Sequence, residues 1–260
     1  MLPLFKSHFS IGKSILTLDD PKKTTPEGSD SVFSILQEEK MNKLILVEDT
    51  LIGFFEAYKR CKELNIQLIF GLRLSMRNSS LEEDAGSSHK IIVFAKNNEG
   101  CKLLNKIYSK AFCEFSGFLD YKSLKNLWDE NHLKLAIPFY DSFIHVNTLS
   151  FANALPDMTF THPVLLEESN NLALDLVLSQ KVKDFAANNC LPIEKAKSIY
   201  YKSKKDVNAF MTYKIICNRS FGKDRTLEKP ELPHFCSDDF CFESWKENTT
   251  SEIKAQYVTL

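Results

Sequence analysis

The sequence predicts an α/β fold in which buried strands alternate with amphipathic helices. Short apolar runs recur along the chain and several end in polar side chains, as "KLILVED" does, which is typical of strands buried in a parallel sheet. Between these runs, apolar residues recur three and four positions apart, which is the spacing of one helix face. Such alternation predicts an open sheet or a barrel, and in both folds functional side chains follow the carboxyl ends of strands.

The N-terminal segment is expected to contain a strand, a loop and a helix. The apolar run at residues 2–5 predicts the first strand, and it leads to a single histidine, His8. Residues 19–30 hold two prolines and a glycine, which predicts a surface loop. Ser31 is then placed to cap a helix, because the residues after it recur at helical spacing in "SVFSILQEEKM".

Strands and helices are expected to continue alternating up to about residue 112. Strands are predicted at "LILV", "QLIFGLRLSM" and "KIIVFAK", with a polar hairpin-like loop, "MRNSSLEEDAGSSHK", between the last two. The helix "IGFFEAYKRCKELNI" is expected to bury a stripe of Phe54, Phe55, Tyr58, Cys61 and Leu64. The helix "NNEGCKLLNKIYSKAF" is expected to bury Leu103, Leu104, Ile107 and Phe112.

The second half continues the same alternation. A helix is expected near 121–130, a strand at 133–139, a helix near 169–188, and then the segment "LPIEKAKSIYY". The functional residues are therefore expected at the ends of strands, in the segments 6–10, 47–50, 71–75, 137–142 and 198–201.

Composition predicts a cytoplasmic protein without a membrane partner. The chain has 260 residues and a net charge of −1, which gives no overall bias toward nucleic acid or acidic lipid. No apolar run is long enough to span a bilayer, and the start resembles no signal peptide. Seven scattered cysteines without a CxxC pair argue against disulfides or structural zinc. The basic segment, Lys181–Lys229, is either a solvated helical face or a patch that contacts nucleic acid.

Several segments, in order along the chain, resemble a known family. They are "LILVEDTLIGFFEAYKRCKELNIQLIFGLRL", "HKIIVFAKNNEGCKLLNKIYSKAF", "LPIEKAKSIYYKSKKDVNAFMTYKIICNRSF" and "LPHFCSDDFCFESWKE". They resemble the N-terminal PHP (polymerase and histidinol phosphatase) domain of bacterial DNA polymerase III alpha subunits. The resemblance implies an irregular seven-stranded (β/α) barrel over residues 1–247, as a single domain, with residues 248–260 as a C-terminal tail. Some members of this family are trinuclear-metal phosphoesterases.

On this resemblance, only part of the family's metal-ligand set is present. The first His-x-His motif falls on Lys6 and His8, so an ammonium replaces the first ligand. The second motif falls on Glu48 and Asp49, of which either could be the equivalent acid, and no histidine follows. His89 stands where the family has a ligand histidine before the next strand.

The remaining ligand positions are substituted. Arg73 stands where the family has a glutamate, which exchanges a negative ligand for a permanent positive charge. The position after the 133–139 strand falls on Tyr140 or on Asp141, which could serve as a fourth ligand, and the late Asp-x-His falls on Ser198 and Tyr200.

A decayed metal centre is therefore expected, with no catalytic residue and no metal or small-molecule cofactor, because too few ligands and two introduced cations cannot hold several divalent ions. If the site retains function, Zn²⁺ or Mn²⁺ bound by His8, Glu48 or Asp49, and His89 is expected. Otherwise Lys6 and Arg73 are expected to pair with Glu48 or Asp49, and both histidines to be satisfied residues at strand ends.

Three functions stay open from the sequence. The first is a non-catalytic scaffold that binds a replication protein, such as a polymerase or exonuclease subunit, or DNA. The second is a metal-dependent phosphoesterase or exonuclease with a reduced ligand set. The third is the PHP portion of a split or truncated polymerase, because the chain has no room for the polymerase palm. A phage or viral genome is the expected source.

Overall fold

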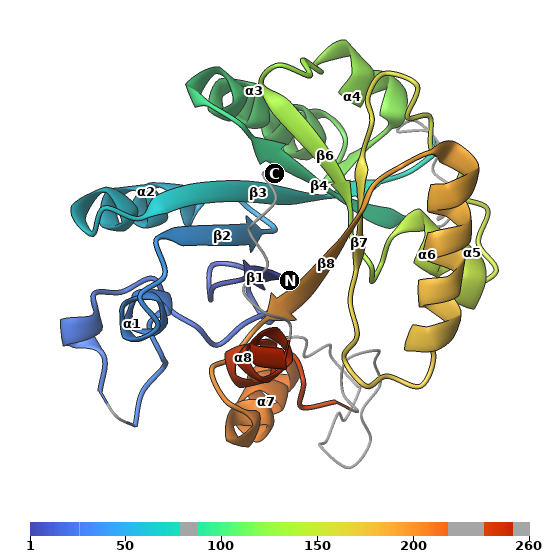
Figure 1. The fold of residues 1–260 in the computed structure, drawn as a ribbon. Helices are drawn as coiled ribbons and strands as arrows, with labels where there is room; N and C mark the ends of the chain where they lie inside the picture. The colour runs from blue at the N-terminus through green and yellow to red at the C-terminus, as the bar shows by residue number, and fades with distance from the viewer. Residues whose placement is uncertain (26, 79–87, 218–236, 252–260) are drawn as a thin grey trace.

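The computed structural model describes residues 1–25, 27–78, 88–217 and 237–251. Its centre is a closed barrel (Figure 1) made of β1 (Leu2–Phe5), β2 (Lys43–Glu48), β3 (Gln67–Met76), β4 (His89–Ala95), β6 (Leu133–Ile137), β7 (Val164–Glu167) and β8 (Ile193–Ile199). The strands follow this order around the barrel, and β8 pairs with β1 to close it. A short strand, β5 (Phe118–Leu119), adds to β3. The predicted seven-stranded α/β barrel is confirmed.

One strand of the barrel runs against the others. β4 is antiparallel to both β3 and β6, whereas the other strand pairs in the barrel are parallel. The predicted polar loop falls between the antiparallel strands β3 and β4, and its residues 79–87 lie outside the described residues. Because of this reversal, the first residues of β4 lie beside the carboxyl ends of its neighbours.

Helices surround the barrel on its outer side (Figure 1). They are α1 (Val32–Glu38), α2 (Phe54–Glu63), α3 (Asn98–Ser109), α4 (Tyr121–Asn126), α5 (Phe143–Leu149), α6 (Asp175–Asn189), α7 (Val207–Cys217) and α8 (Phe242–Ser251). The predicted cap of the first helix is confirmed, since the Ser31 side chain accepts a hydrogen bond from Phe33 N. None of the described helices combines the length and the apolar character that crossing a membrane requires.

Alternation along the strands divides the apolar side chains between two cores. One set of strand residues fills the barrel interior, and the other packs outward against the helices. The interior set is Leu2, Leu4, Ile45, Val47, Ile92, Phe94, Ala136, Val164, Leu166 and Ala196. The same alternation decides which polar side chains at the strand ends face the barrel axis.

Some local predictions are wrong. Phe55 is 71% exposed and Tyr58 is 49% exposed, because α2 packs through Ala57 and through Cys61, whose burial was predicted. Phe112 is also exposed, since α3 ends at Ser109 and Phe112 lies in the π-helical turn Lys110–Glu114 that follows.

Helix α6 begins later than the predicted residue 169. The Asp175 carboxylate accepts hydrogen bonds from the backbone N–H groups of Asn170 and Leu172, which holds that stretch as a loop. The predicted strand at 133–139 ends at Ile137, before Pro138. Strand β7 and helix α5 were not predicted. The expected boundary of the tail at residue 247 falls inside α8, which continues to Ser251.

The described part of the basic segment does not form one face. Two of its lysines lie on α6, and Lys197 is buried with its ammonium donating to a backbone carbonyl. Lys202 pairs with Glu38 at 3.0 Å, and Lys204 pairs with Glu247 at 2.7 Å. Residues 218–236 of this segment lie outside the described residues.

Candidate functional site

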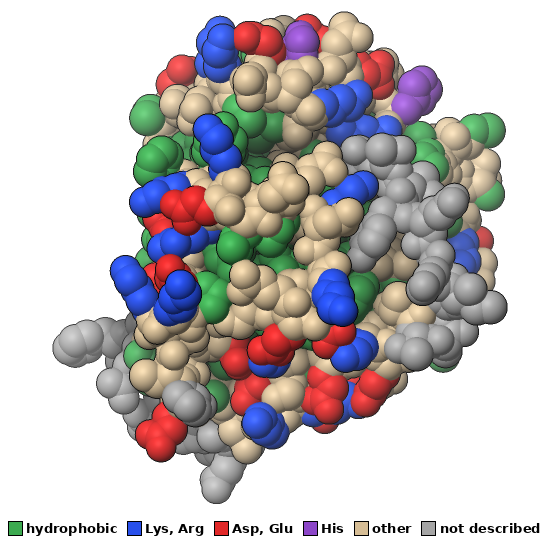
Figure 2. Space-filling view, turned by 60° about the vertical axis from the view of Figure 1, so that its left-hand side comes forward, with side chains coloured by type: hydrophobic (Ala, Val, Ile, Leu, Met, Phe, Trp, Pro, Cys, Tyr) green, Lys and Arg blue, Asp and Glu red, His purple; other side chains and the backbone are tan. Residues whose placement is uncertain are grey.

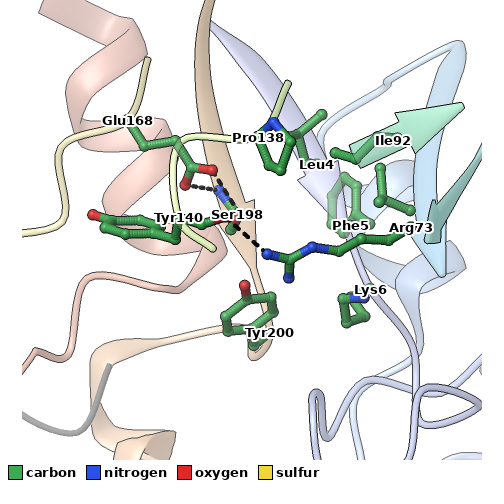
Figure 3. Close-up of a pocket in the computed structure, with 11 residues that line it drawn as sticks. Leu4, Phe5, Lys6, Arg73, Ile92, Pro138, Tyr140, Glu168, Ser198 and Tyr200 are labelled. Atoms are coloured by element: carbon green, nitrogen blue, oxygen red, sulfur yellow. Dashed lines mark hydrogen bonds between the residues drawn. The ribbon is translucent and has the colours of Figure 1, made fainter. Parts of the chain in front are cut away.

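Polar and charged side chains converge at one end of the barrel, which we call the barrel mouth. The carboxyl ends of the parallel strands and the first residues of β4 meet there. On each strand, the residue two positions beyond the last interior residue, or four positions on β3, therefore also faces the barrel axis. These side chains are Lys6, Asp49, Arg73, Lys90, Glu168 and Ser198. Figure 3 shows several of them pointing toward one another from separate strands.

Lys6 and Asp49 form an ion pair between the ends of β1 and β2. Lys6 Nζ lies 3.2 Å from Asp49 Oδ1, and the two side chains are 4% and 26% exposed. Burial lowers the pKa of Lys6, although Asp49 opposes that shift. Burial acts to raise the pKa of Asp49, but Lys6, Arg73 and Lys90 outweigh it, and that pKa lies below its usual value.

Arg73 reaches across the mouth from β3 to the loop that follows β6. Its Nη2 donates to the Tyr140 carbonyl at 3.0 Å and to Asp141 Oδ2 at 2.9 Å. Asp141 has a φ of +61°, a conformation that few non-glycine residues adopt, and its carbonyl accepts from Lys90 N at 2.7 Å. The guanidinium group of Arg73 therefore lies at the centre of the mouth, and the Asp141 carboxylate on the opposite side neutralises its charge.

Glu168 lies on the far side of the mouth, directly after β7. It is buried and accepts hydrogen bonds from Ser198 N at 2.8 Å, Ser198 Oγ at 2.9 Å and Asn170 Nδ2 at 3.1 Å. All three donors are neutral (the first two are drawn in Figure 3). Burial raises the pKa of Glu168 despite these bonds.

Two tyrosines close the same side of the mouth. Tyr140 Oη donates to Asp175 Oδ1 at 2.9 Å and accepts from Asn170 Nδ2 at 3.1 Å. Tyr200 stacks on Phe240, with ring centroids 5.4 Å apart and planes 6° apart. Burial raises the pKa of both phenols, so both hydroxyls stay protonated. The two rings therefore form one wall of the mouth.

The space left among these side chains is small. The cavity lined by Lys6, Arg73, Tyr140, Glu168 and Tyr200 has a volume of about 20 Å³. That is room for about one water molecule. The Arg73 side chain extends into the space at the centre of the barrel end (Figure 3).

The alternation along β2 places Glu48 and Asp49 on opposite sides of the strand end. Glu48 faces outward, where it accepts from Ser7 N at 2.9 Å and from Ser10 Oγ. Ser10 Oγ also accepts from Asp49 N at 2.9 Å. Burial raises the pKa of Glu48. Of the two acids that the sequence left open, Asp49 is the one that faces the mouth, and Glu48 fixes the loop after β1.

The two candidate histidines lie apart from the mouth's centre. His89 faces the outer layer from β4, where Nε2 lies 2.8 Å from Tyr121 Oη and the ring contacts Phe143. His8 lies in the turn after β1, with its ring centroid 4.3 Å from that of Phe9. In the part of the chain that the structure describes, no three His, Cys, Asp or Glu side chains gather closely enough to hold a metal ion.

Sequence reasoning missed Glu168 and Lys90 as residues of the mouth. Glu168 had a visible signal, because "PVLLEES" ends an apolar run in two acids just as "LILVEDT" does. Lys90 had none, because only the antiparallel register of β4 turns Lys90 inward and His89 outward.

Comparison with known proteins identifies the family of the chain. No curated protein sequence matches it. The family model described as "PHP domain" matches residues 27–169, which is more than half of the chain and includes β2, β3, β4, β6 and β7. The chain belongs to the PHP domain family.

Proposed function

We propose that this PHP domain has exchanged hydrolysis for a binding role in DNA replication. The family is of phosphoesterase type. The observation that carries the proposal is the pair of cations in the barrel mouth, where Lys6 binds Asp49 and Arg73 binds Asp141. Side-chain ammonium and guanidinium groups then supply the positive charge that divalent ions supply in a metal-dependent phosphoesterase.

Electrostatics supports the loss of metal binding. A divalent ion at Asp49 would have to displace an ammonium that is covalently fixed beside it, and Arg73 would repel the ion from the other side. A catalytic metal needs neutral imidazoles and free carboxylates. In the mouth, Asp49 and Asp141 are ion-paired, and Glu168 is held by three neutral hydrogen-bond donors.

The replication role follows from the resemblance to polymerase III alpha subunits, and it is the finer part of the proposal. A PHP module without hydrolysis fits a scaffold that contacts a polymerase or exonuclease subunit, or DNA, in the cytoplasm. A palm-coding gene directly beside this one in the source genome would instead indicate a split polymerase.

A hydrolysis assay tests the proposal. The purified chain is incubated with an aryl phosphate and with labelled single-stranded DNA, each with Mn²⁺, with Zn²⁺ and with EDTA. We expect the same background rate in all three, and the same rate from Asp49→Asn and His8→Ala. Hydrolysis that requires Mn²⁺ or Zn²⁺ and disappears in either variant would show a working phosphoesterase and overturn the proposal.

A further inference from the structure

A second cavity, which we call the flank cavity, lies outside the barrel between α5, α6 and the connection from α5 to β7, residues 150–163. Helices α5 and α6 lie side by side on that flank (Figure 1). The cavity has a volume of about 660 Å³. Sites for small molecules have volumes of about 300 to about 1,000 Å³. The flank cavity shares no lining residue with the cavity in the barrel mouth, so it is a separate candidate site.

The flank cavity has an apolar floor and a polar opening. Phe143 and Ile144 on α5 line the cavity and are buried, so they form its floor. Lys181 and Asn189 on α6 line it and are exposed, so they lie at its opening. Phe185 stands four residues from each of them, on the same face of α6, and also lines the cavity. This arrangement fits a ligand with an apolar body and a polar end.

The connection that covers the cavity is held by side chains from outside it. Asn147 Nδ2 donates to the Ala154 carbonyl at 3.0 Å, and Asn147 Oδ1 accepts from Ala154 N at 2.8 Å. Farther along, Thr161 Oγ1 donates to Glu130 Oε1 at 3.2 Å. These bonds keep the connection from collapsing into the cavity. Connections longer than about 12 to 15 residues without secondary structure are uncommon and are usually functional.

The charge at the opening is positive. Among the described residues, the Lys181 ammonium has neither a hydrogen-bond acceptor nor a counter-ion. None of the described residues that line the cavity carries a carboxylate. Two acids close to it in the chain are engaged elsewhere, since Asp184 accepts from Gln180 at 2.8 Å and Asp157 accepts from Thr159 Oγ1 at 2.7 Å. An anionic group at the opening would therefore complement the charge of Lys181.

We propose that the flank cavity binds a small amphipathic anion, an unbranched apolar chain that ends in a carboxylate. The chain packs against Phe143, Ile144 and Phe185, and the carboxylate lies at Lys181. Burial of the methylene groups supplies most of the affinity, and the ammonium selects the charge of the polar end. The inference goes beyond the proposed function and does not depend on it, because the barrel mouth takes no part.

A rival apolar surface on another flank could bind the same ligand. Figure 2, seen from the side of α1, α2 and α3, shows hydrophobic side chains gathered across the middle of that face. Phe55 on α2 is 71% exposed, and the cavity between α2 and α3 has a volume of about 220 Å³. Because this volume is smaller, we expect an extended chain to prefer the flank cavity, and Phe55 provides the control.

The first experiment measures binding of octanoate, decanoate and dodecanoate to the full chain by isothermal titration calorimetry. Each ligand is kept below its critical micelle concentration. We expect a single bound molecule per chain and an affinity that rises about tenfold with each added pair of methylene groups. Decanol should bind about tenfold more weakly than decanoate, because it lacks the charge that Lys181 recognises. Decylammonium should bind more weakly still.

The second experiment separates the charge from the cavity. Lys181→Glu should weaken decanoate binding about tenfold and leave decanol binding unchanged, which damage to the fold would not do. The matched control is Lys59→Glu, an exposed lysine on α2, which should change neither. Met158→Trp places a larger side chain in the cavity and should weaken both ligands about tenfold. Phe55→Ala should weaken neither.

Several results would overturn the inference. They are no binding of dodecanoate, equal affinity for decanol and decanoate, equal losses in Lys181→Glu and Lys59→Glu, or a loss in Phe55→Ala without one in Met158→Trp. The last result would place the ligand on α2. None of these titrations uses a metal ion or a phosphoester, so their failure leaves the proposed function standing. Metal-dependent hydrolysis would likewise contradict the proposed function alone.

Discussion

The two sides of the barrel mouth shift the pKa of a buried carboxyl group in opposite directions. On the β1–β3 side, Asp49 faces Lys6 and Arg73, and its pKa is lowered. On the β7–β8 side, Glu168 faces Ser198 and Asn170, and its pKa is raised. Both acids follow an apolar strand and face the same axis. Their protonation is decided by whether the neighbouring strands offer cations or neutral dipoles, which the local sequence does not state.

The largest expected effect comes from removing the carboxylate on the cation-rich side. Asp49→Asn keeps the shape of the side chain but leaves the buried Lys6 ammonium without its counter-ion. We expect the free energy of unfolding to fall by about 3 kcal/mol in urea denaturation at neutral pH. The double variant Lys6→Met, Asp49→Asn should recover most of that loss, because it removes both charges. Equal stability of Asp49→Asn and the parent would mean that the ion pair contributes nothing.

The neutral side should respond less, and in proportion to lost hydrogen bonds. Glu168→Ala leaves the Ser198 N–H without its acceptor and leaves the Asn170 amide with Tyr140 Oη alone, at a cost of about 2 kcal/mol. Glu168→Gln is the matched control, since its amide oxygen can accept both bonds and its NH₂ can donate to Ser198 Oγ. If Gln destabilises as much as Ala, the charge of Glu168 matters and the comparison between the two sides fails.

Asp49→Asn and Glu168→Gln should also show opposite pH dependence. The folded pKa of Glu168 is raised, so wild-type stability relative to Glu168→Gln should fall as pH rises above the usual 4.5. The folded pKa of Asp49 is lowered, so wild-type stability relative to Asp49→Asn should be fully present above 3.8 and should fall as pH drops below it. The urea midpoints of the wild type and of both variants, measured from acid to neutral pH, check both signs. If the stability difference between wild type and variant changed with pH in the same direction for Asp49→Asn and Glu168→Gln, the assigned pKa directions would be contradicted.

The smallest effect is expected at the pair that is most open to solvent. Asp141 is 39% exposed, so Asp141→Asn should cost no more than about 1 kcal/mol through the lost contact with Arg73. Asn tolerates the positive φ at this position, whereas Asp141→Ala should cost about 1 kcal/mol more. Thermal denaturation of both variants separates charge from backbone strain, and a larger loss in the Asn variant would reverse that assignment.

The sequence predicted the barrel better than it predicted its mouth. Strands β2, β3 and β4 were recognised because their apolar runs are local, and α1 because Ser31 caps it. Strand β7 has the same apolar-then-acidic ending as β2, but it is short and follows a long loop, so no strand was expected there.

At the mouth, the sequence could not predict the register between strands. Whether Glu48 or Asp49, and whether His89 or Lys90, faces the axis follows from pairing with distant strands. Lys6 was expected to pair with Glu48 or Asp49, and it pairs with Asp49, whereas Arg73 pairs with Asp141 instead.

The most direct test of the central claim is elemental analysis of the chain after equilibration with Mn²⁺ and Zn²⁺ and removal of excess ions. The replacement of divalent ions by Lys6 and Arg73 predicts far less than one ion per chain, and it predicts a gain of bound metal in the variant Lys6→His, Arg73→Glu. A wild-type chain that retains near-stoichiometric zinc or manganese would contradict it.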